Sequence, residues 1–274
     1  MTIELDGVAA YRVLGTSFCV VSDTADLLHL LDDLYVHCAF SGVAEHVIEI
    51  VSEPEGLCLA VNSVVQIRGV AQAALLGRFV WEINRLVRST PTAALLVHGA
   101  MVEIGGRGVM LCGASGSGKS TLALALVERG ARYLSDEIAA IDDVAMSVSA
   151  YPKPITLRPD SWEFVNSLAP NCASEVAGFM RDLWFLTPNL IVDHADVALI
   201  VLPNQLVGMG ESVTEIGGDA ALVALCENTH GMSEGGVAVF RRLARVARQC
   251  PAMQASVRSL FEACDAIEHR VGLL

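Results

Sequence analysis

The sequence predicts an α/β protein in which a mixed sheet with covering helices follows a small α+β domain at the N-terminus. Three observations lead to this prediction. The chain has 274 residues, enough for one large or two modest domains. Hydrophobic residues make up 53 % and charged residues 18 %, a composition typical of packed domains rather than disordered chains. Short apolar runs typical of strands and segments of helical spacing follow one another along the chain.

The first 90 residues predict the small domain. Apolar runs within residues 11–22 indicate a strand, and residues 24–35 have helical spacing. Short strands are then expected over 46–51, 57–61 and 64–68, before a helix with an apolar face over 71–87. Within this region His29, His37 and His46 fit helix faces and turns rather than ligands. The turn-forming run Ser89–Thr92 marks a boundary, so we expect a substrate-holding domain over residues 1–90 and a second domain over 91–274.

A phosphate-binding loop is the strongest signal in the second domain. Three apolar runs, over 94–98, 100–104 and 108–112, indicate strands, and a helix is expected over 121–129. Between them residues 113–120 read GASGSGKS, which matches the pattern G-x-x-x-x-G-K-[ST]. Glycines let backbone N–H groups point at phosphate oxygens, the lysine reaches the outer phosphates, and the serine hydroxyl ligates Mg²⁺. The predicted nucleotide-binding residues are Gly113, Ala114, Ser115, Gly116, Ser117, Gly118, Lys119, Ser120 and Thr121.

Two acids follow the predicted helix. Asp136 and Glu137 end a short strand that would return beside the phosphate loop, where one carboxylate could organise a metal and the other accept a hydroxyl proton. The apolar run 197–202 ends in Pro203 and offers no acid. The sequence contains neither the N-K-x-D segment that selects guanine nor an L-S-G-G-Q-like transporter signature.

These segments, taken together, resemble the catalytic domain of bacterial HPr kinase/phosphorylase. The resemblance is carried, in order and spacing, by VHGAMVE (97–103), GVMLCGASGSGKS (108–120), the helix ending in Gly130, and YLSDE (133–137). More weakly, residues 151–157 and the chain after them resemble HPr-kinase-related proteins of peptide-modification systems, including lasso-peptide kinases.

The resemblance implies an ATP-dependent kinase that uses Mg²⁺ and phosphorylates a serine hydroxyl. It implies that Lys119 and Ser120 handle the phosphates and Mg²⁺, that Asp136 is the general base, and that His98 tunes Asp136. Glu137 stands where the family has a second Asp, near the metal. The family's later E-I-R-G-L-G segment is not found, so neither HPr as substrate nor the reverse, phosphorolytic reaction follows.

Net charge and composition limit the classes of binding partner and the location that we expect for this protein. The chain carries 18 Lys+Arg against 31 Asp+Glu, a net charge of −13, which argues against nucleic acid as a partner. No apolar run is long enough to span a membrane, and no signal peptide is visible, so a cytoplasmic protein is expected. The eight cysteines lack metal-ligand spacing and fit small buried hydrophobes. The expected partners are a nucleotide and a serine-containing peptide or protein, and a homo-oligomer is compatible with the sequence.

Three functions remain open from the sequence: a serine kinase acting on a protein or a lasso-type precursor peptide, a small-molecule kinase, and a nucleotide-binding regulatory module. For the second, residues 170–196 could form a substrate lid with Arg181, Asp182, Asp193, His194 and Asp196. Arg158, Arg241 and Arg242 are candidates for stabilising the transferred charge. Helices are expected over 219–227 and 237–249. The arginines 241, 242, 245 and 248 there predict a solvated face or a phosphate contact, and the role of Lys153 stays undecided.

Overall fold

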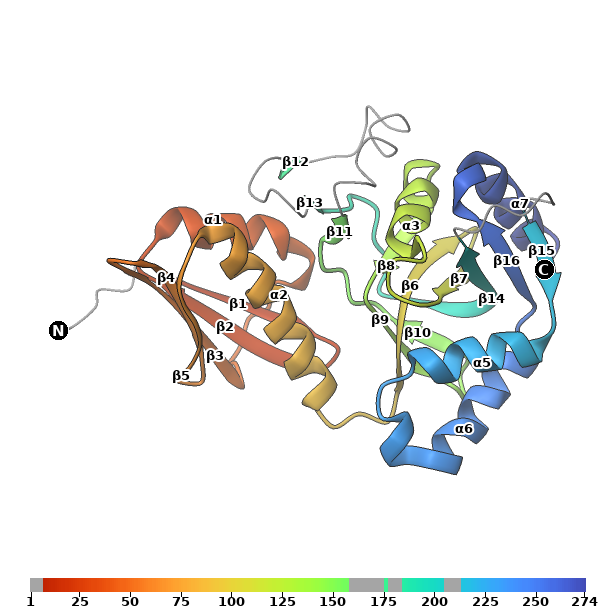
Figure 1. Ribbon diagram of the computed structural model, residues 1–274, viewed down its shortest axis with the longest axis horizontal. Coiled ribbons are helices and arrows are strands. Elements are labelled where there is room, and N and C mark those ends of the chain that lie inside the picture. The colour runs from red at the N-terminus through yellow and green to blue at the C-terminus, as the bar shows by residue number, and fades with distance from the viewer. Residues whose placement is uncertain (1–6, 158–174, 177–183, 205–212) are drawn as a thin grey trace. The chain divides into compact units, whose positions relative to one another are not determined.

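The protein divides into two compact units. The computed structural model describes residues 7–157, 175–176, 184–204 and 213–274 (Figure 1). The first unit comprises Met1–Pro91 with Pro152–Pro154 and Ser174–Thr187, and the second comprises the rest of the chain. A small α+β unit precedes an α/β unit with a mixed sheet, so the predicted fold class is confirmed. Among the described helices, none combines the length and the apolarity that crossing a bilayer requires.

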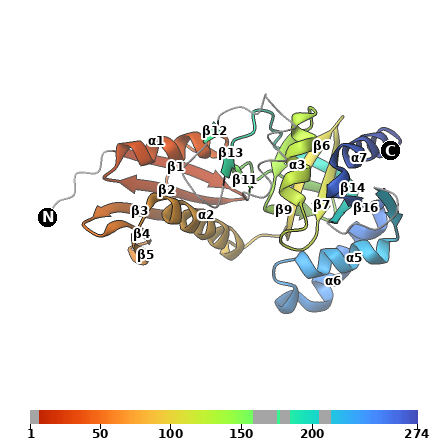
Figure 2. The ribbon, with the colours of Figure 1, turned by 45° about the horizontal axis from the view of Figure 1, so that its top comes forward.

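The first unit is a five-stranded sheet with helices packed against it (Figure 2). Its elements are β1 (Gly7–Val13), β2 (Thr16–Ser22), α1 (Ala25–Leu34), the 3-10 turn η1 (Val36–Cys38), β3 (His46–Glu53), β4 (Gly56–Val61), β5 (Val64–Val70) and α2 (Gln72–Ser89). The sheet order follows the chain order, and only the β2–β3 pair is parallel, with α1 in the connection. Phe18 of β2 contacts the rings of Tyr35, just after α1, and Phe79 of α2, which centres the core on that face of the sheet. Two short strands later in the chain, β12 (Glu175–Val176) and β13 (Trp184–Leu186), pair antiparallel.

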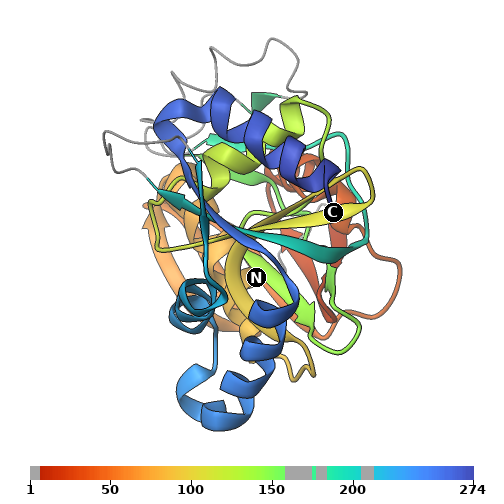
Figure 3. The ribbon, with the colours of Figure 1, turned by 90° about the vertical axis from the view of Figure 1, so that its right-hand side faces the viewer.

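The second unit is built on an eight-stranded sheet covered on both faces, and its strand β11 lies outside that sheet. Its elements are β6 (Leu95–Ile104), β7 (Arg107–Cys112), α3 (Lys119–Glu128), β8 (Arg132–Ser135), β9 (Ile138–Asp142), β10 (Ser147–Ser149), β11 (Ile155–Leu157), β14 (His194–Asn204), β15 (Val213–Ile216), α5 (Gly218–Asn228), α6 (Met232–Gln249), β16 (Ala252–Ser256), η2 (Val257–Ser259) and α7 (Leu260–Gly272). The strand order is β10-β9-β6-β7-β14-β16-β15, with β8 paired to β6. Figure 3 shows α3 and α7 on one face of the sheet and α5 and α6 on the other. The parallel centre β7–β14–β16 places the end of β7, and hence the phosphate loop, in the middle of the sheet.

Several elements differ from their predicted bounds for identifiable reasons. The run 11–22 is a hairpin of two strands, because Leu14 and Gly15 both have positive φ and turn the chain. The runs 94–98 and 100–104 form one strand, since Gly99 keeps its place in the ladder opposite Cys112. Helix α3 begins at Lys119 rather than Thr121, and α6 begins at Met232 with a kink at Gly236.

The four arginines of α6 were expected to form a solvated face or to contact a phosphate. Two of them have a different role. Arg242 and Arg245 both bind the buried carboxylate of Asp143, at 2.7 and 2.8 Å. Arg242 also donates to the carbonyl of Ala93. These two arginines therefore fasten α6 to the β9–β10 turn, whereas Arg241 and Arg248 are exposed. The sequence pattern could not identify a buried acid a hundred residues away as their partner.

The C-terminal end of the predicted substrate lid, residues 170–196, belongs to a strand of the sheet. His194 and Asp196 belong to β14 and pair with Ser149 and Ser147 of β10, so they are strand residues. Asp193 immediately precedes that strand. Arg158, Arg181 and Asp182 lie outside the described residues.

Candidate active site

The phosphate loop connects the buried strand β7 to helix α3. Gly116 and Gly118 have φ angles of 80° and 102°, which L side chains rarely adopt. A Cβ on Gly118 would also lie 2.8 Å from a methyl group of Val257, so glycine is required there for space as well. The N–H of Leu122 bonds to the Gly118 carbonyl at 2.9 Å, which starts the helix directly behind the loop. The N-terminal end of α3 is therefore oriented toward any phosphate in the loop.

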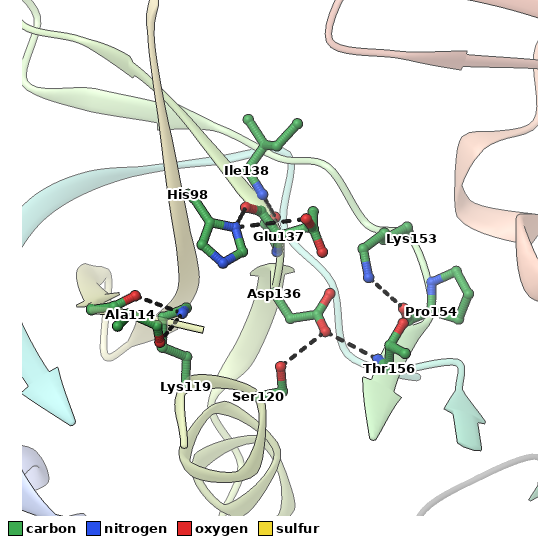
Figure 4. Close-up of polar contacts among 12 residues, drawn as sticks. His98, Ala114, Lys119, Ser120, Asp136, Glu137, Ile138, Lys153, Pro154 and Thr156 are labelled. Carbon is green, nitrogen blue, oxygen red and sulfur yellow. Dashed lines mark hydrogen bonds and ion pairs between the residues drawn. The ribbon is translucent and has the colours of Figure 1, made fainter. Parts of the chain in front are cut away.

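Lys119 is buried and folds back over the loop that precedes it. Its Nζ donates to the carbonyl oxygens of Gly113 at 2.7 Å and Ala114 at 3.0 Å (Figure 4). Burial lowers the pKa of the ammonium, and the nearby acids Glu137 and Asp136 oppose that effect. The hydroxyl of Ser117 is buried and has no hydrogen-bond partner among the described residues. A loop with a buried unpartnered hydroxyl and a cationic side chain fits a polyanionic ligand.

Asp136 lies beside the start of α3. The carboxylate is 4 % exposed, and its Oδ2 accepts hydrogen bonds from Ser120 Oγ at 3.3 Å and from the backbone N–H of Thr156 at 3.0 Å (Figure 4). Its Oδ1 accepts from the hydroxyl of Tyr133 at 3.0 Å. Strand β8 thus delivers Asp136 to the serine of the phosphate loop, as the sequence predicts. Tyr133 and Thr156 were not predicted as neighbours, because nothing in their spacing signals the contact.

Glu137 pairs with His98 rather than with Ser120 in this structure. Nδ1 of His98 lies 3.0 Å from the backbone carbonyl oxygen of Glu137 and 3.6 Å from its Oε1. Burial, and then the charge of Lys119, lower the pKa of His98, so the imidazole is neutral at neutral pH. Because a carbonyl oxygen only accepts, the contact assigns the proton to Nδ1 and leaves Nε2 as an acceptor. His98 was expected to tune Asp136, whereas its hydrogen bond is to Glu137.

The donor set suits Mg²⁺. Of the two expected ligands, Ser120 offers a hydroxyl and Glu137 a partly exposed carboxylate, and the Asp136 carboxylate lies 3.3 Å from the Ser120 hydroxyl. Hard oxygen ligands of this kind suit Mg²⁺, which binds through one or two carboxylates together with substrate phosphates. The described residues contain no group of three or more His, Cys, Asp or Glu side chains arranged around one metal position.

Lys153 is the other lysine of the chain and is completely buried. Its Nζ donates to the Pro154 carbonyl at 3.0 Å, and both residues belong to the first unit. It lies close enough to Cys38 to oppose the effect of burial, which raises the pKa of that thiol to about 12. The described contacts place Lys153 in the packed interior, against the Pro154 carbonyl and near Cys38.

A phosphate loop at the centre of a mixed sheet, with two acids delivered by the strand after its helix, defines a P-loop α/β domain. Residues 91–156 match the family model of the HPr serine kinase C-terminal domain. Over this segment the chain is similar to the HPr kinases, as the motifs predicted.

Individual relatives agree with the family match. An HPr kinase/phosphorylase of Lactobacillus acidophilus is 58 % identical over 41 residues, and that of Lachnoclostridium phytofermentans is 34 % identical over 67 residues. These matches cover 15 and 24 % of this chain, and only 13 and 22 % of the two relatives. Among solved structures, the HPr(Ser) kinase/phosphatase of Coxiella burnetii aligns with a TM-score of 0.33 and 14 % identity, over 65 % of this chain and 97 % of that one.

Proposed function

We propose that this protein is an ATP-dependent serine kinase that acts on a protein or peptide, with a lasso-type precursor peptide as the favoured substrate. The observation that carries the proposal is the contact of Asp136 with Ser120, beside Lys119 at the start of α3. This contact supports the proposal because it puts a carboxylate next to the serine of the phosphate loop, beside the place where the outer phosphates of a nucleotide would bind. A cytoplasmic location, where ATP and Mg²⁺ are abundant, is part of the same proposal.

In the proposed reaction, Asp136 accepts the proton of the substrate serine while its oxygen forms a bond to the γ-phosphorus. The bond between that phosphorus and the β–γ bridging oxygen breaks, and ADP leaves with the electron pair. Lys119 leaves the loop carbonyls to bind the outer phosphates, and its charge stabilises the transferred group. Ser120 and Glu137 are the proposed Mg²⁺ ligands, and bound Mg²⁺ supplies charge neutralisation at the β- and γ-phosphates.

The choice of a peptide acceptor rests on the chain outside the match. HPr itself is not favoured, because the E-I-R-G-L-G segment is missing from the sequence. The first unit contains no phosphate-loop motif and offers a sheet whose edge strand β5 includes exposed Val64 and Val65. We propose that the predicted N-terminal domain, residues 1–90, holds the peptide substrate, while residues 91–274 carry the chemistry.

The test is incubation with γ-labelled ATP, Mg²⁺ and a panel of acceptors. The panel contains serine-bearing precursor-type peptides, the same peptides with Ser→Ala, and small hydroxylated metabolites. Label on the serine peptides alone supports the proposal. Label on a metabolite establishes a small-molecule kinase, and nucleotide binding without transfer indicates a regulatory module.

Asp136→Asn is the diagnostic variant for the chemistry. An amide cannot accept the serine proton, so we expect transfer to fall by about a hundredfold or more, while the affinity for ATP stays within about threefold. Transfer and ATP binding are measured on the same preparation, with Arg248→Ala on the exposed face of α6 as the control. Normal turnover of Asp136→Asn would show that another group is the base.

A further inference from the structure

Tyr133 is completely buried on β8 and donates its hydroxyl to Oδ1 of Asp136 at 3.0 Å. The phosphate-loop chemistry described above does not use this phenol. Oδ2 of the same carboxylate accepts from Ser120 Oγ and from the N–H of Thr156. The two oxygens are therefore held by donors from three separate elements, β8, α3 and β11.

The contact requires an irregular strand end. In a straight strand, residues three apart lie about 10 Å from each other and point to opposite faces. Strand β8 departs from this geometry, because Tyr133 is opposite Val102 and Ser135 is opposite the adjacent Met101, so Leu134 is the extra residue of a bulge. Beyond the bulge, the Ser135 hydroxyl accepts the N–H groups of two following residues, Glu137 and Ile138. The bulge and the turn together bring Asp136 back to the phenol.

Tyr133 is itself firmly held. Its backbone pairs with β6 on one side, and on the other its N–H donates to the Leu190 carbonyl at 2.8 Å. Its own carbonyl accepts from Val192 at 3.2 Å. The backbone of Tyr133 is thus fixed on both sides and its ring is completely buried, and together these hold the hydroxyl beside the carboxylate. Rotation of Asp136 would break the bonds at both oxygens at once.

We propose that Tyr133 is a positioning residue, whose hydroxyl fixes the Asp136 carboxylate with Oδ2 facing Ser120 and the phosphate loop. The proposal rests on the proposed function, since it specifies how the base of that reaction is oriented. A hydrogen bond to a charged group makes a large contribution when both partners are buried. Its loss should slow transfer by about tenfold to a hundredfold without changing how ATP is held.

The test compares Tyr133→Phe with Tyr11→Phe. Tyr11 is a matched control, because it is buried in the first unit and donates to the Asp32 carboxylate at 2.6 Å. With the peptide identified by the acceptor panel, or with the release of ADP from Mg·ATP, we expect kcat of Tyr133→Phe to fall by about tenfold to a hundredfold. The KM for ATP should stay within about twofold. In the ADP-release assay, which contains no peptide, Tyr11→Phe should keep both values. Equal kcat values for Tyr133→Phe and the wild type would overturn the proposal.

A second measurement does not depend on any kinase activity. Urea unfolding of Tyr133→Phe, Asp136→Ala and the double variant forms a cycle that isolates the contact between the two side chains. We expect the two effects on the unfolding equilibrium constant to be non-additive by about fivefold or more. If the effects of the two substitutions are additive, the side chains of Tyr133 and Asp136 do not interact, and the proposal is wrong. If the wild type phosphorylates no acceptor but the cycle shows coupling, the proposed function fails while the positioning of Asp136 by Tyr133 stands.

Discussion

Lys119 gives the most direct prediction among the single residues. Lys119→Ala removes the one side-chain cation that contacts the loop carbonyls of Gly113 and Ala114 in the described structure, and with it the charge that would face the phosphates. We expect the affinity for ATP to fall by about a hundredfold or more, because charge-assisted bonds to phosphate are lost. Titration with a fluorescent ATP analogue measures this effect. Binding within about threefold of the wild type would show that the loop does not hold the outer phosphates.

His98 predicts a pH dependence of stability. Burial and the charge of Lys119 lower its pKa below the ordinary value of 6.5. Below pH 6.5 the unfolded chain therefore takes up a proton that the folded chain refuses, so stability falls as the pH drops, and the loss levels off below the folded pKa.

The variant His98→Gln removes this titration. The difference in the free energy of unfolding between wild type and His98→Gln should therefore shift against the wild type as the pH falls from 6.5. Urea unfolding at several pH values measures it, and comparison with the variant cancels the other histidines. A difference that is constant across this range would contradict the lowered pKa of His98.

Site residues that belong to a sequence motif could be predicted individually. Residues whose contacts depend on the tertiary structure could not. The G-x-x-x-x-G-K-S pattern identifies Lys119 and Ser120, and strand–helix–strand order brings Asp136 to them. The hydrogen bond of His98 to Glu137 instead of Asp136 depends on how β6 meets the turn after β8. Tyr133 reaches Asp136 only through a bulge, and a bulge has no signature in these residue types.

At the scale of elements, the junction of the loop and α3 makes glycine essential at position 118. An alanine there would need a φ near 102° and a Cβ 2.8 Å from Val257 of η2. We expect Gly118→Ala to destabilise the protein by about 1–3 kcal/mol and to weaken ATP binding, since the helix end moves. Gly272→Ala is the control, because its Cβ would meet nothing within 4 Å and its φ is ordinary. Thermal unfolding and ATP titration of both variants provide the measurement, and equal behaviour of the two would contradict the close packing of η2.

The elements that could be predicted were those with a strong apolar pattern and clear ends. Helix α2 and strand β7 closely follow their predicted ranges because both are amphipathic or continuously buried. The hairpin of β1 and β2 was missed, since Leu14 adopts a positive φ that its residue type does not suggest. The attachment of α6 through Arg242, Arg245 and Asp143 was missed because sequence distance conceals the partner.

At the scale of the whole molecule, the cysteines report on how the chain is packed. Burial raises the pKa of the Cys38, Cys112 and Cys264 thiols to about 12 and that of Cys250 to about 11. At pH 8 only about one thiol in ten thousand with a pKa of 12 is the reactive thiolate.

Alkylation of the native protein at pH 8, followed by peptide mapping, should therefore leave these four cysteines unmodified. The partly exposed Cys19 and Cys226 should react before them. The urea-unfolded chain, in which every thiol is accessible, is the control. Modification of Cys112 as fast as Cys19 would show that the strand leading into the phosphate loop opens in solution.

The division into two units could be expected only in part from the sequence. The main division falls after Pro91, within the turn-forming run Ser89–Thr92. The first unit, however, also takes in Pro152–Pro154 and Ser174–Thr187, which follow the phosphate loop by many residues. Composition and turn-forming residues locate boundaries along the sequence. They do not show that a later segment packs with an earlier unit.

The resting position of Lys119 has a consequence for how much the lysine adds to nucleotide binding. Because the ammonium is already satisfied by the oxygens of Gly113 and Ala114, an arriving anion must replace those two bonds before it gains anything from the lysine. A triphosphate tail, which presents the oxygens of several phosphate groups along the loop, can replace both bonds and still contact the backbone N–H groups. We therefore expect Lys119 to add less to ATP binding than an ammonium that starts without partners would, because two bonds to carbonyl oxygens are lost when the bonds to phosphate form.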